Sequence, residues 1–159
     1  MSLAPYPTLE LLNAVRDLYT VIERFDAFTA RKLGVDRSGL RAINAMEHGS
    51  ISPGALGKLL DLSSGSVTAL LDRLEKGGHI ERLKPDRDGR RRDARLKPAT
   101  HNVAQSYYSQ LGGSINDAFG KLGPQEFLQS MFAIRELARC FDKTCAEELS
   151  DGNGDVDTE

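Results

Sequence analysis

Apolar positions recur every three or four residues along most of the chain, a spacing that predicts helices. The first such stretch runs from Thr8 to Leu33 and ends at Gly34, a residue typical of helix C-termini. A second is expected at 37–47. Near the C-terminus, an apolar residue recurs at every fourth position over 103–119, and Pro124 opens a last helix. The chain is therefore mainly α-helical.

The middle of the chain predicts two short helices joined by a tight turn. Ser52 and Pro53 have the character of an N-cap followed by a proline in the first helical position. "DLSS" then breaks the apolar pattern and leaves Ser63 or Ser64 to cap a new helix. One face of that helix is apolar, with Val67, Leu70, Leu71 and Leu74. The glycine pair 77–78 ends it.

After the glycine pair the apolar period changes. "HIERLKP" and "RDARLKP" each predict a short strand, and "DRDG" between them has the residue types of a turn. The fold class expected is thus mainly α with a small β-hairpin wing. A helix pair followed by such a hairpin is a winged helix-turn-helix.

Charge is distributed unevenly along the 159 residues. The net charge is −2, but the last fourteen residues, 146–159, carry six acidic and no basic side chains. Without them the remaining chain has a charge of +4. This acidic tail has little to bury, so we expect it to be disordered.

The positive charge is concentrated in the predicted hairpin. Ten basic and five acidic residues lie between Arg73 and Lys97. We expect five of the arginines to contact DNA: Arg73, Arg87, Arg90, Arg91 and Arg92. Focused charge on a protruding hairpin suits phosphate neutralisation, and arginine suits a narrow minor groove. The partner that this pattern predicts is double-stranded DNA.

At these residues the sequence resembles the MarR family of bacterial transcriptional regulators. "LSSGSVTALLDRLEKGGHIER" is similar to the family's recognition helix, and "PDRDGRRRDARL" to its wing. The resemblance covers nearly the whole chain and implies one regulator domain, 1–145. Within it, a DNA lobe at about 37–98 would be flanked by dimerisation helices at about 8–33 and 101–145, with the tail, 146–159, outside.

The resemblance also implies roles for individual residues. Ser63, Ser64, Ser66 and Thr68 would face the major groove of a pseudo-palindromic operator. Asp72 and Arg90 would form an ion pair that braces the wing. The family usually has alanine at Gly57 and glycine at Asp61, where aspartate still tolerates a left-handed turn.

The function implied is that of a homodimeric repressor relieved by a small aromatic or phenolic effector. A reducing, cytoplasmic setting is expected because the two cysteines, Cys140 and Cys145, point apart on one predicted helix. Tyr19, Phe25 and Tyr107 are candidates to line the effector crevice, although ordinary core packing explains them better. A redox sensor acting through Cys140 and Cys145 is one alternative function, and a protein-interaction module without a DNA role is another.

An enzymatic function would be the contrasting class, and catalytic motifs give it no support. The sequence has no G-x-S-x-G, H-E-x-x-H, phosphate-binding glycine loop or C-x-x-C. Its histidines, His48, His79 and His101, lie in different predicted elements. We therefore expect no enzyme, no cofactor and no metal.

Overall fold

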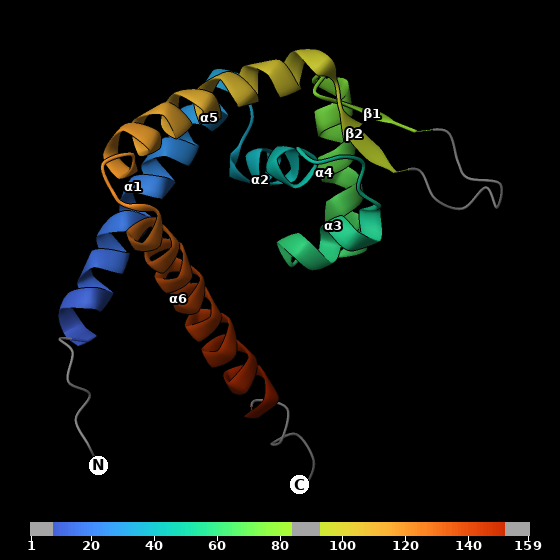
Figure 1. Ribbon diagram of the computed structural model, residues 1–159. Helices are drawn as coiled ribbons and strands as arrows, with labels where there is room; N and C mark the ends of the chain where they lie inside the picture. Colours follow the sequence, from blue (N-terminus) through green and yellow to red (C-terminus); the bar gives the residue numbers. More distant parts are fainter. Residues whose placement is uncertain (1–7, 84–92, 152–159) are drawn as a thin grey trace, which may run out of the picture. The chain divides into compact units, whose positions relative to one another are not determined.

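The computed structural model describes the backbone of residues 8–83 and 93–151, with side chains up to residue 146. Figure 1 shows mainly helices with one small hairpin, which confirms the predicted fold class. The described elements are α1 (Thr8–Leu33), α2 (Arg37–Ala45), α3 (Pro53–Leu60), α4 (Ser64–Lys76), β1 (Ile80–Arg82), β2 (Ala94–Leu96), α5 (Pro98–Phe119) and α6 (Pro124–Asp151).

Contacts divide the chain into two compact units, Met1–Ser109 and Gln110–Glu159. The first holds α1 to α4, the hairpin and the start of α5, and the second holds the end of α5 and α6. In the second unit the rings of Phe119 and Phe127 meet edge to face, 6.4 Å apart. The Gly123 N–H donates to the Glu126 carboxylate at 2.8 Å, which fixes the start of α6.

Local capping signals set the helix starts in the first unit. The Asp36 carboxylate accepts from the Gly39 N–H at 2.8 Å and caps α2. The Ser52 hydroxyl accepts from the Ala55 N–H at 3.2 Å and caps α3, whose first residue is Pro53 as expected. Each cap satisfies a backbone donor that a helix start leaves free.

The core of the first unit lies where α2, α3, α4 and the hairpin meet. Its largest fully buried side chains are Leu40, Ile43, Leu56, Val67, Leu71, Leu74, Ile80 and Thr29. The apolar face predicted for α4 is entirely inside this core. Burial of that face leaves the polar face of the helix in solvent.

The hairpin joins the core through its first strand pair. β1 and β2 are antiparallel, with Ile80 opposite Leu96 and Arg82 opposite Ala94. Ala94 also exchanges two backbone hydrogen bonds of 2.9 Å with Ile51, from the segment before α3. The base of the wing is therefore tied to the helix pair on two sides.

Two helix ends differ from those expected from the sequence. α5 begins at Pro98 rather than near residue 101, because proline fits the first turn of a helix, where no backbone donor is needed. α6 continues to Asp151, past the start of the predicted disordered tail at residue 146. The stretch from Ala146 to Leu149 consists of good helix formers, which accounts for this extension.

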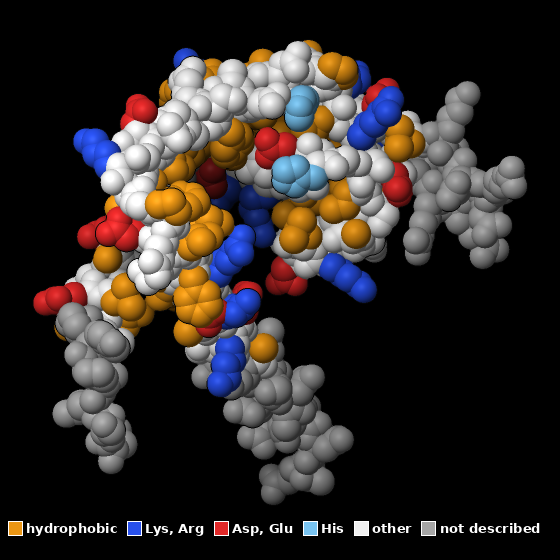
Figure 2. Space-filling model, viewed as in Figure 1, with side chains coloured by type: hydrophobic (Ala, Val, Ile, Leu, Met, Phe, Trp, Pro, Cys, Tyr) orange, Lys and Arg blue, Asp and Glu red, His pale blue; other side chains and the backbone are white. Residues whose placement is uncertain are grey.

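The long helices carry large apolar side chains that are open to solvent. Leu9 of α1 is 68% exposed, and Leu128 and Phe132 of α6 are each 65% exposed. Such side chains are visible over the surface of α1 and α6 in Figure 2. Among residues 8–83 and 93–151, no helix has the length and apolar character needed to cross a membrane.

Two leucines of α3 allow a direct test of this core. Leu56 is fully buried, whereas Leu59, three residues later, is 58% exposed. We expect Leu56→Ala to lower the free energy of unfolding by about 2–5 kcal/mol, measured by urea denaturation, because it leaves a cavity. Leu59→Ala makes the same chemical change on the surface and should alter it by less than about 0.5 kcal/mol. Similar losses for both variants would contradict this packing.

Candidate nucleic-acid interface

The turn between α3 and α4 is short and brings the two helices close together. Asp61 closes α3 in the left-handed conformation, with φ 55° and ψ 54°, as the sequence predicted. The Leu62 N–H donates to the Gly57 carbonyl at 2.9 Å. A Cβ atom at Gly57 would lie only 3.1 Å from the Leu62 carbonyl oxygen, so glycine suits this approach.

The first turn of α4 is held by a serine cap. Of the two serines predicted as candidates, Ser63 is the cap, and its hydroxyl accepts from the Ser66 N–H at 3.3 Å. It also shares a hydrogen bond of 2.9 Å with the Ser66 hydroxyl. The Thr68 hydroxyl donates to the Ser64 carbonyl at 3.0 Å. These bonds hold the hydroxyls of Ser63, Ser66 and Thr68 at the start of the helix.

All four hydroxyl residues predicted to face DNA, Ser63, Ser64, Ser66 and Thr68, are exposed in the structure. They lie on the solvent-exposed surface at the start of α4, whereas Val67 and Leu71 of the same helix are buried. This face carries short polar side chains near the start of the helix, a surface on which base edges can approach closely.

The base of the wing is bound to α4 by one arginine. Arg82 of β1 donates through Nη2 to the Asp72 carboxylate, and its Nε lies 3.2 Å from Glu75 Oε2. Both acidic residues lie on α4, and the Arg82 side chain is only 21% exposed. The ion pairs therefore fix the direction in which the hairpin leaves the helix.

The wing residues predicted to contact DNA, Arg87, Arg90, Arg91 and Arg92, lie outside the described residues. The Asp72–Arg90 ion pair thus stays a prediction. Sequence reasoning missed Arg82 as a partner of Asp72. The signal available was its place on the strand that follows the helix, ten residues after Asp72.

Arg73, also predicted to contact DNA, is bound within the protein. Its Nη2 donates to both oxygens of Asp36, at 3.0 and 2.8 Å. Asp36 is the N-cap of α2, so this ion pair links the C-terminal half of α4 to the start of α2. Sequence reasoning did not single out Asp36 or this link.

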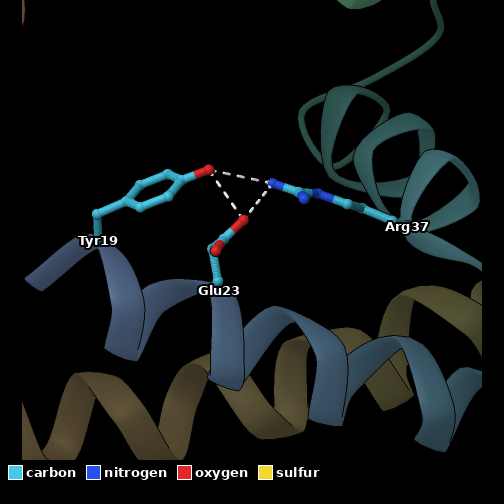
Figure 3. Close-up of polar contacts among 3 residues, drawn as sticks. All are labelled: Tyr19, Glu23 and Arg37. Carbon is cyan, nitrogen blue, oxygen red and sulfur yellow. Dashed lines mark hydrogen bonds and ion pairs between the residues drawn. The ribbon is translucent and has the colours of Figure 1, made fainter. Parts of the chain in front are cut away.

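Arg37, the residue after Asp36, binds two side chains of α1. Figure 3 shows Arg37 directed at Tyr19 and Glu23, which lie one turn apart on α1. Its Nη2 lies 2.6 Å from Glu23 Oε1 and 3.2 Å from the Tyr19 hydroxyl, which itself donates to Glu23 at 2.9 Å. The hydrogen bond with Tyr19, and then the charge of Glu23, raise the pKa of Arg37.

A cleft of about 440 Å³ opens between α1 and the start of α2. Its lining residues are Glu23, Asp26, Ala27, Ala30, Arg31, Val35, Arg37 and Leu40. Burial raises the pKa of Asp26, an effect that the charge of Arg37 partly offsets. The cleft therefore combines an apolar floor with charged side chains of both signs.

The three residues predicted to line an effector crevice have other neighbours. Phe25 packs edge to face on Tyr108 with ring centres 5.6 Å apart, and Tyr107 packs in the same way on Phe28 at 5.4 Å. Tyr19 reaches Arg37, which lines the cleft, but is itself not part of the lining. Cys140 and Cys145, the residues of the redox alternative, are both free and exposed on α6.

The helix pair, α3 and α4, and the hairpin that Arg82 joins to α4 together form a winged helix-turn-helix. A sequence model described as the MarR family matches residues 30–91, the part that contains the helix pair and most of the wing. A curated relative from Bacillus subtilis, named as an uncharacterized HTH-type transcriptional regulator, YcgE, is 43% identical over 77 residues. That match spans 48% of this chain and 50% of the relative, about half of its length.

Solved structures share the fold of the described chain. A MarR family protein from Bacillus stearothermophilus has a TM-score of 0.70 at 16% identity, covering 89% of this chain and 99% of its own. NadR, solved in complex with 4-hydroxyphenylacetate, has a TM-score of 0.59 at 19% identity, covering 87% and 97%. Residues 30–91 therefore carry the sequence pattern of the MarR family, and the described chain shares the fold of these solved structures.

The cap of α4 can be tested apart from any DNA contact. Ser63→Ala removes the side chain that accepts from the helix start, so we expect the free energy of unfolding to fall by about 1 kcal/mol in urea denaturation. Ser64→Ala removes a neighbouring exposed hydroxyl that is not the cap and should leave stability within about 0.5 kcal/mol. Equal stability of the two variants would show that Ser63 does not cap the helix.

Proposed function

We propose that the protein is a homodimeric, sequence-specific DNA-binding transcriptional regulator, and that it is a repressor relieved by a small effector. The observation that carries this proposal is the solvent-facing polar side of α4 beside a hairpin whose base Arg82 holds to that helix. Short hydroxyl side chains suit the major groove, and the arginine-rich sequence of the hairpin suits phosphates.

The homodimer is proposed because the long helices α1 and α6 expose large apolar side chains. Side chains as large as Leu9, Leu128 and Phe132 lie mostly in solvent in a single chain. A second copy of the chain could cover them, and a dimer would place two reading helices about one turn of DNA apart. This arrangement requires a pseudo-palindromic operator.

The effector is proposed to be a small aromatic or phenolic molecule. The solved structure of NadR holds such a compound, 4-hydroxyphenylacetate. In this chain the cleft beside Arg37 offers apolar walls and a guanidinium group, which suit an aromatic ring with an acidic substituent.

DNA binding is the first experiment. We expect the protein to bind a labelled duplex from upstream of its own gene more tightly than a shuffled duplex in fluorescence anisotropy. The affinity should fall steeply with salt, because phosphate contacts release counterions. Replacing Arg90 and Arg91 by alanine should weaken binding and lower the slope of log affinity against log salt by about 0.9 for each lost phosphate contact.

Two results would contradict DNA binding through the wing. Absence of binding to either duplex at low salt would remove the regulator function. Unchanged affinity and slope in the double alanine variant would instead favour a winged helix that binds another protein.

Dimer formation can be tested on α6. Phe132→Glu places a charge in an exposed apolar surface, so we expect sedimentation to shift from twice 17.4 kDa toward the monomer. Gln129→Glu adds the same charge to the same helix without removing apolar surface and should leave the dimer intact. A wild-type protein that sediments as a monomer would contradict the proposal.

A further inference from the structure

The start of α2 is held by two other helices through consecutive residues. Asp36 accepts from Arg73 of α4, and Arg37 binds Glu23 and Tyr19 of α1. Asp36 also caps its own helix through the Gly39 N–H, so its carboxylate is fixed on the backbone of α2. Arg73 is thus bound to a carboxylate whose position is set by the start of α2, which α1 also holds through Arg37.

We infer that Arg73 acts in DNA binding as a positioning residue, through Asp36, and not as a phosphate ligand. The inference rests on the proposed function. One guanidinium nitrogen of Arg73 contacts both oxygens of the Asp36 carboxylate. A phosphate that took Arg73 would leave the charge of Asp36 unpaired and close to the DNA, where it would repel the backbone. The intact pair avoids this repulsion.

Orientation is what the pair adds to the packing of α4. Apolar contacts hold α4 in the core but resist small rotations of the helix about its axis only weakly, since they lack direction. Arg82 contacts the same helix at Asp72 and Glu75, and Arg73 contacts a different element, α2. Two polar links on different sides of the helix fix the direction in which Ser64, Ser66 and Thr68 point.

The two roles of Arg73 predict opposite effects of a change at Asp36. If Arg73 bound a phosphate, Asp36 would compete for it, and Asp36→Asn would strengthen DNA binding. If Arg73 positions the helix, Asp36→Asn breaks the link and weakens binding. Asparagine is also a good N-cap, so α2 keeps its start in this variant.

The test compares Asp36→Asn, Arg73→Gln and the double variant by fluorescence anisotropy on the upstream duplex at several salt concentrations. We expect each single variant to lose about two- to fivefold in affinity, the range that couplings of exposed ion pairs support. The double variant should be no weaker than either single one, because all three remove the same link. The salt slope should match that of the wild type, because no phosphate contact is lost.

Asp61→Asn is the matched control. It removes one negative charge beside the start of α4, at an exposed residue whose left-handed conformation asparagine tolerates. This variant should bind as tightly as the wild type or slightly more tightly. It therefore measures the effect of charge alone.

Binding by Asp36→Asn that equals or exceeds that of Asp61→Asn would overturn the inference, and so would a salt slope lower by about 0.9 in Arg73→Gln. In both cases the wild type still binds, and the proposed function stands. A wild type that binds neither duplex at low salt would overturn the proposed function and the inference with it.

Discussion

Burial of one face of α4 is the constraint on which the rest of the first compact unit depends. Val67, Leu70, Leu71 and Leu74 are all nearly inaccessible to solvent, and each such side chain contributes about 1.5–3 kcal/mol when removed from water. Rotating the helix to expose them would cost far more than any of its polar contacts could return. The polar side of α4 is therefore the outward side, whatever it binds.

Apolar burial decides which face is outward, and polar links refine the direction. Arg82, Asp36 and the backbone bonds between Ala94 and Ile51 connect α4 and the hairpin to different parts of the core. Exposed ion pairs add little stability individually. Their value in this fold is geometric, because they link α4 to the hairpin and to α2 at defined points.

Local signals in the sequence were sufficient for most element boundaries. Capping residues such as Ser52 and Pro53 act within one turn of the backbone, so the start of α3 follows from a few neighbouring letters. The left-handed Asp61 follows from residue type in the same way. The end of α6 lies at Asp151, five residues past the expected start of the tail, because Ala146 to Leu149 are good helix formers although the tail has few apolar residues.

Contacts between distant residues could not be predicted in the same way. The partner of Asp72 depends on which arginine the folded hairpin brings near it, and the hairpin offers many arginines of equal chemistry. Among the described residues, Arg82 lies near Asp72, and the Asp72–Arg90 ion pair stays a prediction. Similarly, the ion pair of Arg73 with Asp36 joins residues 37 positions apart along the chain, so no local pattern indicates it.

If the proposed function holds, these pairings assign different parts of DNA binding to α4 and to the hairpin. The two arginines nearest the end of α4, Arg73 and Arg82, are bound to Asp36, Asp72 and Glu75, so their charges are largely neutralised within the protein. The start of the helix offers uncharged hydroxyls. In the proposed function, attraction to DNA would then come mainly from the arginine-rich sequence between the strands, and α4 would supply shape and hydrogen-bonding groups. An uncharged helix surface of this kind suits discrimination between bases, because discrimination depends on where hydrogen-bonding groups are placed and not on net charge.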